Sequence, residues 1–148
     1  MSMLAENKRA RFDYDILETY TAGIELTGHE VKSLKIRGGS MPSGHIIVRN
    51  EEAYLVGLDI SPFQPKNAPP NYDPQRTRRL LLRKNEIKHL IGKNSEGLTI
   101  IPIKLYNNPR GLIKVEIALA RGRKKHDKRE LLKKRETMRE LRKGSAGL

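Results

Sequence analysis

The 148-residue chain contains no cysteine and no tryptophan. Without thiols it forms neither disulfides nor thiolate metal sites, and this composition is compatible with a reducing cytosol. No apolar stretch approaches the roughly 20 residues that span a bilayer. The first residues, MSMLAENKRARF, lack the apolar run of a signal peptide. We therefore expect a cytoplasmic protein that has no membrane segment.

Catalytic motifs are equally scarce. The four histidines occur in neither an HExxH nor an HxH spacing, and no GxSxG is present. The segment RGGSMPSG resembles a phosphate loop only in its glycines, because it lacks GxxxxGK[ST]. Carboxylates such as Glu30, Asp59 and Asp73 show no spacing that pairs an acid with a base. The sequence therefore predicts no enzyme activity, no metal site and no cofactor.

Positive charge is what the chain has in excess, with a formal net charge of +13. Residues Arg121 to Lys143 hold twelve Lys or Arg and four Asp or Glu, so this segment carries +8 and the residues before it carry +5. Such a segment attracts polyanions. Nucleic acid fits better than a membrane, because the apolar stripe of the segment is thin and broken.

Two further basic runs precede this segment. One extends from Asn7 to Arg11, and the other surrounds the apolar block at residues 80–82 with Arg76, Arg78, Arg79, Arg83 and Lys84. A single charged run is normally a solvated face. Three runs on one small domain instead favour contacts with phosphates, and the release of counterions makes such binding steeply salt-dependent.

Aromatic side chains are sparse, with five tyrosines and two phenylalanines. Domains that read single-stranded RNA on an open sheet display several rings for base stacking. The tyrosines here are scattered and fit packing positions. The composition therefore favours recognition of a folded RNA through its shape and backbone.

The chain divides into a β-rich body, residues 1–120, and a basic tail, residues 121–148. Alternating apolar residues expected on one face run from Tyr54 to Ile60 and from Ile113 to Leu119. The residues NNPRG favour a hairpin turn before the last strand. The predicted strands lie near residues 13–20, 23–26, 45–48, 53–60, 98–106 and 112–120.

Helical spacing predicts two short helices, at residues 29–36 and 84–93, the second ending near Gly92. Five or six short antiparallel strands with few helices predict a mainly β fold, a small OB-like barrel, because closure hides the strand edges. In the tail, Asp127 and Glu130 form a candidate capping box. Like charges crowd the tail, so we expect it to be disordered when free and helical beside a polyanion.

Five segments, taken in order, resemble the SmpB family, small protein B, which binds transfer-messenger RNA (tmRNA, also called SsrA RNA). They extend from about Leu4 to Lys143 and read ENKRAR, YDILETYTAGIELTGHEVKSL, YDPQRTRRLLL, LTIIPIKLY and KVEIALARGRKKHDKR. Each segment is unspecific alone, whereas their order and spacing together are highly specific.

The resemblance implies a protein that rescues ribosomes stalled on messages without a usable stop codon, by trans-translation. The barrel would hold the tRNA-like domain of tmRNA and stand in for the missing anticodon arm. The tail would enter the decoding centre and the empty mRNA channel of the small subunit. The implied partners are tmRNA, the ribosome and, through the charged RNA, elongation factor Tu, with the protein acting as a monomer.

The resemblance also implies site residues. Glu30 is acidic, so its expected role is to position cationic side chains, whereas Lys114 matches a lysine associated with RNA binding. The predicted RNA-binding residues are Asn7, Lys8, Arg9, Arg11, Glu30, Lys32, Arg76, Arg78, Lys114, Arg123, Lys124 and Lys125. The predicted decoding-centre residues are His126, Asp127, Lys128 and Arg129.

Three positions depart from the family pattern. Thr21 stands where glutamate is usual, Lys35 where arginine is common, and Arg123 where lysine is usual. The first puts an RNA-positioning carboxylate in doubt, and the second loses bidentate phosphate geometry. The alternative function is a structural or assembly OB-barrel protein of the ribosome whose basic extension binds ribosomal RNA.

Overall fold

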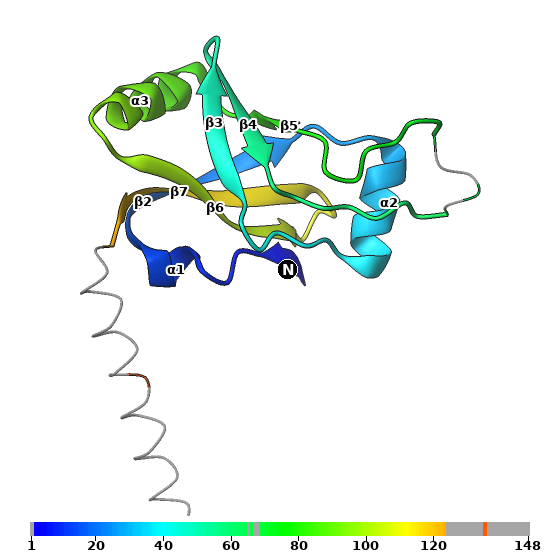
Figure 1. The fold of residues 1–148 in the computed structure, drawn as a ribbon. Helices are drawn as coiled ribbons and strands as arrows, with labels where there is room; N and C mark the ends of the chain where they lie inside the picture. The colour runs from blue at the N-terminus through cyan, green and yellow to red at the C-terminus, as the bar shows by residue number, and fades with distance from the viewer. Residues whose placement is uncertain (1, 65, 67–68, 124–134, 136–148) are drawn as a thin grey trace, which may run out of the picture.

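The described part of the chain forms seven strands, with three helices between some of them (Figure 1). The computed structural model describes residues 2–64, 66, 69–123 and 135. In chain order the elements are β1 (Ser2–Glu6), α1 (Ala10–Asp13), β2 (Tyr14–Ile24), α2 (Gly28–Arg37), β3 (His45–Arg49), β4 (Glu52–Val56), β5 (Arg78–Leu81), α3 (Lys84–Ser95), β6 (Thr99–Asn107) and β7 (Ile113–Gly122).

All seven strands belong to one antiparallel sheet with the order β1-β6-β7-β2-β5-β4-β3. β3 approaches β6 in space, although the two strands are not hydrogen-bonded to each other. The sheet is therefore barrel-like without being closed. The predicted mainly β fold with a few short helices is confirmed.

β6 and β7 carry apolar residues on both faces. Val115, Ile117 and Leu119 point into the main core, as the predicted alternation in this strand requires. On the opposite face a smaller cluster forms beneath α1, made of Ala10, Ile101, Ile103, Ala118 and Ala120. Burial on both faces explains why these strands read as nearly continuous apolar runs.

The predicted face of the strand at residues 53–60 is wrong in its first half. Ala53 and Leu55 are fully buried, whereas Tyr54 and Val56 are half-buried. Gly57 adopts a φ of 94°, which interrupts the alternation after β4. Leu58 and Ile60 are consequently buried on the far side of this break.

Several elements differ from those expected from the sequence. β1 and α1 were not predicted, and β5 lies inside the run that was interpreted as basic. The helix at α2 is confirmed and begins with a capping box between Thr27 and Glu30. α3 is also confirmed, but it continues through Gly92 to Ser95, so Gly92 does not end it.

The last strand extends past the predicted end of the body at residue 120. Arg121 and Gly122 pair with β2, and the backbone N–H of Arg123 donates to the carbonyl of Asp13 at 2.8 Å. The expected disorder of the free tail, and its expected helicity beside a polyanion, concern mainly residues 124–134 and 136–148, which lie outside the described residues.

Candidate nucleic-acid interface

A buried carboxylate links α2 to the basic segment at residues 76–79. Glu30 has a fully buried side chain and occupies the first turn of α2, where its carboxylate accepts from the Thr27 backbone at 3.0 Å. Arg78 donates to Glu30 Oε2 from Nε at 2.9 Å and from Nη2 at 2.7 Å. Arg76 pairs with the same carboxylate, from Nε at 3.1 Å and from Nη2. Glu30 therefore holds two cationic side chains.

These contacts correct the prediction for Arg78. Its side chain is completely buried and also donates to the carbonyls of Leu58 at 2.6 Å and Pro74 at 2.9 Å. A side chain in this position does not reach a phosphate on the outside of the protein. Its role is to fasten the loop before β5 to the core, because an unpaired buried cation is strongly unfavourable.

Neighbouring arginines in this run also form ion pairs with carboxylates. Arg76 is one third exposed, and Arg79 pairs with Glu25 at 2.9 Å and with Glu52 at 3.2 Å. The run at residues 76–79 therefore presents less positive charge to solvent than its sequence suggests.

The environment of Glu30 keeps it ionised. Burial acts to raise its pKa, but hydrogen bonds from Arg76, from the Thr27 backbone and from Arg78 outweigh burial and lower the pKa to about 2. The negative charge is thus present at every physiological pH. The ion pairs with both arginines persist under the same conditions.

The N-terminal basic element, residues 7–11, connects β1 to α1 and is hydrogen-bonded to β6 through Asn7. Asn7 is only 8% exposed, and its side-chain amide donates to the Pro102 carbonyl at 3.0 Å. Lys8, Arg9 and Arg11 are exposed beside it. Arg9 also pairs with Asp13 at 3.3 Å. Asn7 anchors this element, and the three cations form its surface.

Lys114 lies on the outer face of β7, at the other end of the strand. It is the register partner of Gly23 in β2 and of Tyr106 in β6, and Gly23 in turn faces Leu81 in β5. A Cβ on Gly23 would lie 3.2 Å from Leu81 Cβ and 3.4 Å from Leu81 Cδ1, so glycine at this position leaves room for the Leu81 side chain. Leu81 is 46% exposed. The row across β5, β2, β7 and β6 thus presents, in this order, an apolar residue, a glycine, a cationic residue and an aromatic residue.

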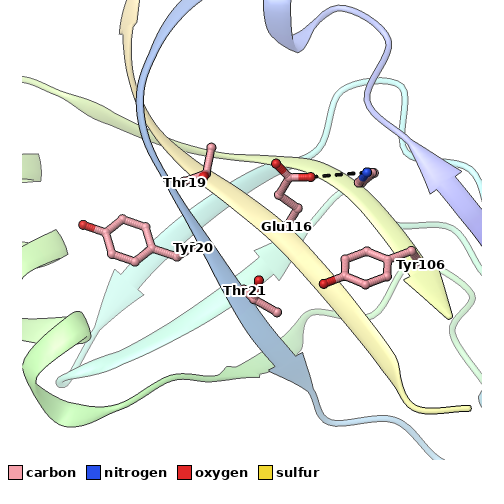
Figure 2. A pocket seen from close by; sticks show the side chains of 6 residues that line it. Thr19, Tyr20, Thr21, Tyr106 and Glu116 are labelled. Carbon is pink, nitrogen blue, oxygen red and sulfur yellow. Dashed lines mark ion pairs between the residues drawn. The ribbon is translucent and has the colours of Figure 1, made fainter. Parts of the chain in front are cut away.

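The adjacent row forms a shallow pocket of about 190 Å³ (Figure 2). Glu116 is the register partner of both Thr21 and Lys104, and Lys104 Nζ lies 3.5 Å from Glu116 Oε2. Lys104 Nζ also lies 5.7 Å from the centre of the Tyr106 ring. We call the six residues that line this pocket the outer-face pocket: Thr19, Tyr20, Thr21, Lys104, Tyr106 and Glu116.

α2 brings further cations to the same end of the sheet. Lys35 Nζ donates to the Gly111 carbonyl at 2.8 Å and so ties α2 to the turn between β6 and β7. Lys32 lies one turn earlier in this helix and is exposed. α2 and the start of β7 lie toward one end of the molecule, and α1 and the end of β7 lie toward the other (Figure 1). The first end carries Lys32 and Lys114, and the second carries Lys8, Arg9 and Arg11, which immediately precede or belong to α1.

The predicted tail residues are only partly described. Arg123 pairs with Asp15 at 3.1 Å and donates to the Tyr14 carbonyl at 3.4 Å, so it is held beside the end of β2 that is next to α1. Lys124, Lys125, His126, Asp127, Lys128 and Arg129 lie outside the described residues.

Two other kinds of feature are absent from the described part of the chain. No three His, Asp or Glu side chains there are grouped so that they could hold a metal ion. Among the same residues, no helix combines the length and apolar character needed to cross a membrane.

Comparison with known proteins decides the family. A family model described as SmpB protein matches residues 4–146. The chain belongs to the SmpB family. The SsrA-binding protein of Thermosipho africanus (strain TCF52B) is 54% identical over 142 residues, which cover 95% of each chain. That of Nostoc punctiforme (strain ATCC 29133 / PCC 73102) is 49% identical over 140 residues, covering 94% of this chain and 90% of the relative.

A solved structure agrees with the sequence relatives. One of its chains matches the SmpB-family fold seen here with a TM-score of 0.65 and 47% identity, covering 81% of this chain and 84% of that chain. The structure is described as tmRNA-SmpB and a journey to the center of the bacterial ribosome.

Sequence reasoning did not single out Lys104, Tyr106 or Glu116 in this SmpB-family chain. A signal was available, because the turn at NNPRG sets the register of the last two strands. Pairing them outward from that turn places Lys104 opposite Glu116 and Tyr106 opposite Lys114, on the face away from the main core.

Proposed function

We propose that this protein binds the tRNA-like domain of tmRNA and delivers it to stalled ribosomes for trans-translation. The observation that carries this proposal is the near full-length match to the SmpB family, whose relatives are named SsrA-binding proteins. In this role the protein is a non-enzymatic RNA-binding factor of the cytoplasm, and its body stands in for the anticodon arm.

The separation of the two basic surfaces supports a division of labour. Lys114 lies near the start of β7, and Gly122 lies at its end beside α1. Eight residues of extended strand span about 26 Å. The end that carries Lys32 and Lys114 would hold tmRNA. The end that carries Lys8, Arg9, Arg11 and Arg123 would face the ribosome and direct the chain after residue 123 toward the decoding centre.

Replacement of Lys114 by alanine tests the first half of this proposal. The affinity of the full chain for the isolated tRNA-like domain is measured by fluorescence anisotropy at several salt concentrations. We expect weaker binding and a salt slope that is smaller by about 1, because one phosphate contact is lost.

Lys93→Ala is the matched control. Lys93 lies in α3 and pairs with Glu96 at 3.4 Å, near the end of the sheet where Thr99 faces Ala120. Its replacement removes the same charge and is expected to leave the slope unchanged. Equal affinity and slope for Lys114→Ala and the unaltered protein would remove Lys114 from the RNA contact surface.

A further inference from the structure

The outer-face pocket contains a carboxylate in the middle of a surface that would face RNA. Glu116 is the acidic member of its six lining residues, and its side chain is 24% exposed. A carboxylate repels phosphates, so its presence on a phosphate-binding surface is unfavourable unless a neighbouring cation neutralises its charge. The ammonium of Lys104, next to Glu116 Oε2, supplies this charge.

The ion pair leaves the carboxylate able to accept more hydrogen bonds. An ionised carboxylate accepts about four hydrogen bonds through its two oxygens, and the ammonium of Lys104, whose Nζ lies 3.5 Å from Oε2, does not use all of them. Nucleotides offer matching donors: the ribose 2′-hydroxyl, and the N–H groups on the edges of guanine, cytosine and adenine. Phosphates offer none, so a nucleotide group that donates to this carboxylate must belong to a sugar or a base.

The walls of the pocket fit a nucleotide as well. Tyr106 is half-buried beside Lys104 and lies over the same stretch of the sheet as Thr21 and Glu116 (Figure 2). Tyr20 points to the other side of β2, where its hydroxyl donates to Glu18 at 2.5 Å. Tyr106 is therefore the aromatic wall of the pocket, and the exposed Thr21 adds a short hydroxyl opposite Glu116.

We infer that the outer-face pocket binds one nucleotide of the folded RNA, with Glu116 accepting a hydrogen bond from its 2′-hydroxyl or from a base N–H, Lys104 neutralising the carboxylate and Tyr106 contacting the sugar or base. This inference rests on the proposed function, because it concerns the same bound RNA. It gives Glu116 a specificity role rather than a role in overall charge attraction.

The test combines protein variants with modified RNA. The affinity for the tRNA-like domain is measured for the unaltered protein, Glu116→Ala and Glu116→Gln. Loss of one charge-assisted hydrogen bond predicts roughly tenfold weaker binding or more for Glu116→Ala. Glu116→Gln keeps the volume and an acceptor oxygen, so a smaller loss is expected.

Glu96→Ala is the matched control, because Glu96 is also paired with a lysine but lies in the residues after α3. Its affinity for the RNA is expected to equal that of the unaltered protein. Circular dichroism and thermal melting verify that each variant is folded.

A cycle with modified RNA separates a direct contact from an effect on folding. Two series of the RNA are used. One has single 2′-deoxy substitutions, and the other has single bases that lack their amino group: inosine for guanosine, purine riboside for adenosine and zebularine for cytidine. At one position the substitution is expected to weaken binding to the unaltered protein and to have no further effect on Glu116→Ala. A deoxy position identifies the 2′-hydroxyl as the donor, and a position in the second series identifies the base that donates.

Two failures can be told apart. If the unaltered protein does not bind the unmodified RNA in preference to a tRNA of similar size, the proposed function is wrong. If it does, but Glu116→Ala and Glu116→Gln bind as tightly as the unaltered protein, or all modifications add independently to the variants, the nucleotide site at Glu116 is refuted while the proposed function stands.

Discussion

Replacing Glu30 by glutamine should destabilise the fold strongly, although the change is nearly isosteric. Glutamine keeps one carbonyl oxygen for the arginines, but its NH2 group faces a guanidinium that donates as well. Arg78 would remain completely buried without a counter-charge, with only neutral acceptors such as the carbonyls of Leu58, Pro74 and Arg76. Removing one partner of a buried ion pair costs about 3–5 kcal/mol, a large fraction of the 5–15 kcal/mol that usually stabilises a domain.

Urea unfolding at pH 7, followed by circular dichroism, measures this loss. The matched control is Glu52→Gln, because Glu52 pairs with Arg79 while 37% of its own side chain stays exposed. Exposed pairs contribute about 0–1 kcal/mol, so the control should unfold close to the unaltered protein. A loss for Glu30→Gln no larger than that of the control would refute the buried network.

A double variant adds a second check. In Glu30→Gln/Arg78→Met the buried cation is replaced by an apolar side chain that needs no counter-charge. Part of the lost stability should return, because removing both members of a buried pair costs much less than removing one. Strictly additive losses from the two substitutions would contradict the pairing.

The remaining predictions concern pH, backbone and tail. The pKa of Glu30 is about 2 in the folded protein, against an ordinary value of 4.5. The stability that its ionised form contributes is therefore complete above pH 4.5 and is lost as the pH falls toward 2. Over this range the unfolding free energy should drop about 3 kcal/mol more in the unaltered protein than in Glu30→Gln. Gly57→Ala should lower the unfolding free energy in urea by about 1–3 kcal/mol or more, because φ is 94° and the new Cβ would lie 2.9 Å from the Gly44 backbone. Gly92→Ala should be neutral or stabilising, because nothing lies within 4 Å of its new Cβ. Equal effects of the two substitutions would contradict the backbone conformation at Gly57. Deleting residues 124–148 should preserve binding to the tRNA-like domain and abolish tagging of stalled chains in a reconstituted translation assay, and parallel loss of both activities would refute the division of labour.

The β6–β7 hairpin was predictable because its information is local. The turn residues and the strict alternation of β7 identify the hairpin and its buried face without reference to the rest of the chain. Both longer helices were predictable for the same reason, since their apolar spacing is contained within a few turns.

The prediction of which face of β4 is buried was wrong because of a change in the backbone that alternation does not describe. Gly57 changes the direction of the chain between Leu55 and Leu58, so a single period of two cannot describe both sides of the glycine. The glycine in AYLVGLDI was the available warning, because glycine inside a strand pattern often marks a bulge or a close backbone approach.

The burial of Arg78 was not predictable because its ion-pair partner is remote in sequence. Glu30 lies 48 residues away, and the charge pattern of residues 76–84 contains no information about it. The same limit applies to the outer-face pocket, whose residues come from three strands that are adjacent only in the folded sheet. Family resemblance identified the basic positions, whereas the fold decides which of their charges reach solvent.

Sequencing the RNA that copurifies with the full chain tests the proposed function most directly. The chain is expressed in a bacterial host, captured, washed in moderate salt, and its RNA is compared with that bound by a Lys114→Ala variant. The account predicts one abundant species, tmRNA, enriched far above tRNA and reduced in the variant. Recovery of ribosomal RNA in stoichiometric amounts, with no enrichment of tmRNA, would contradict it and favour a permanent component of the ribosome.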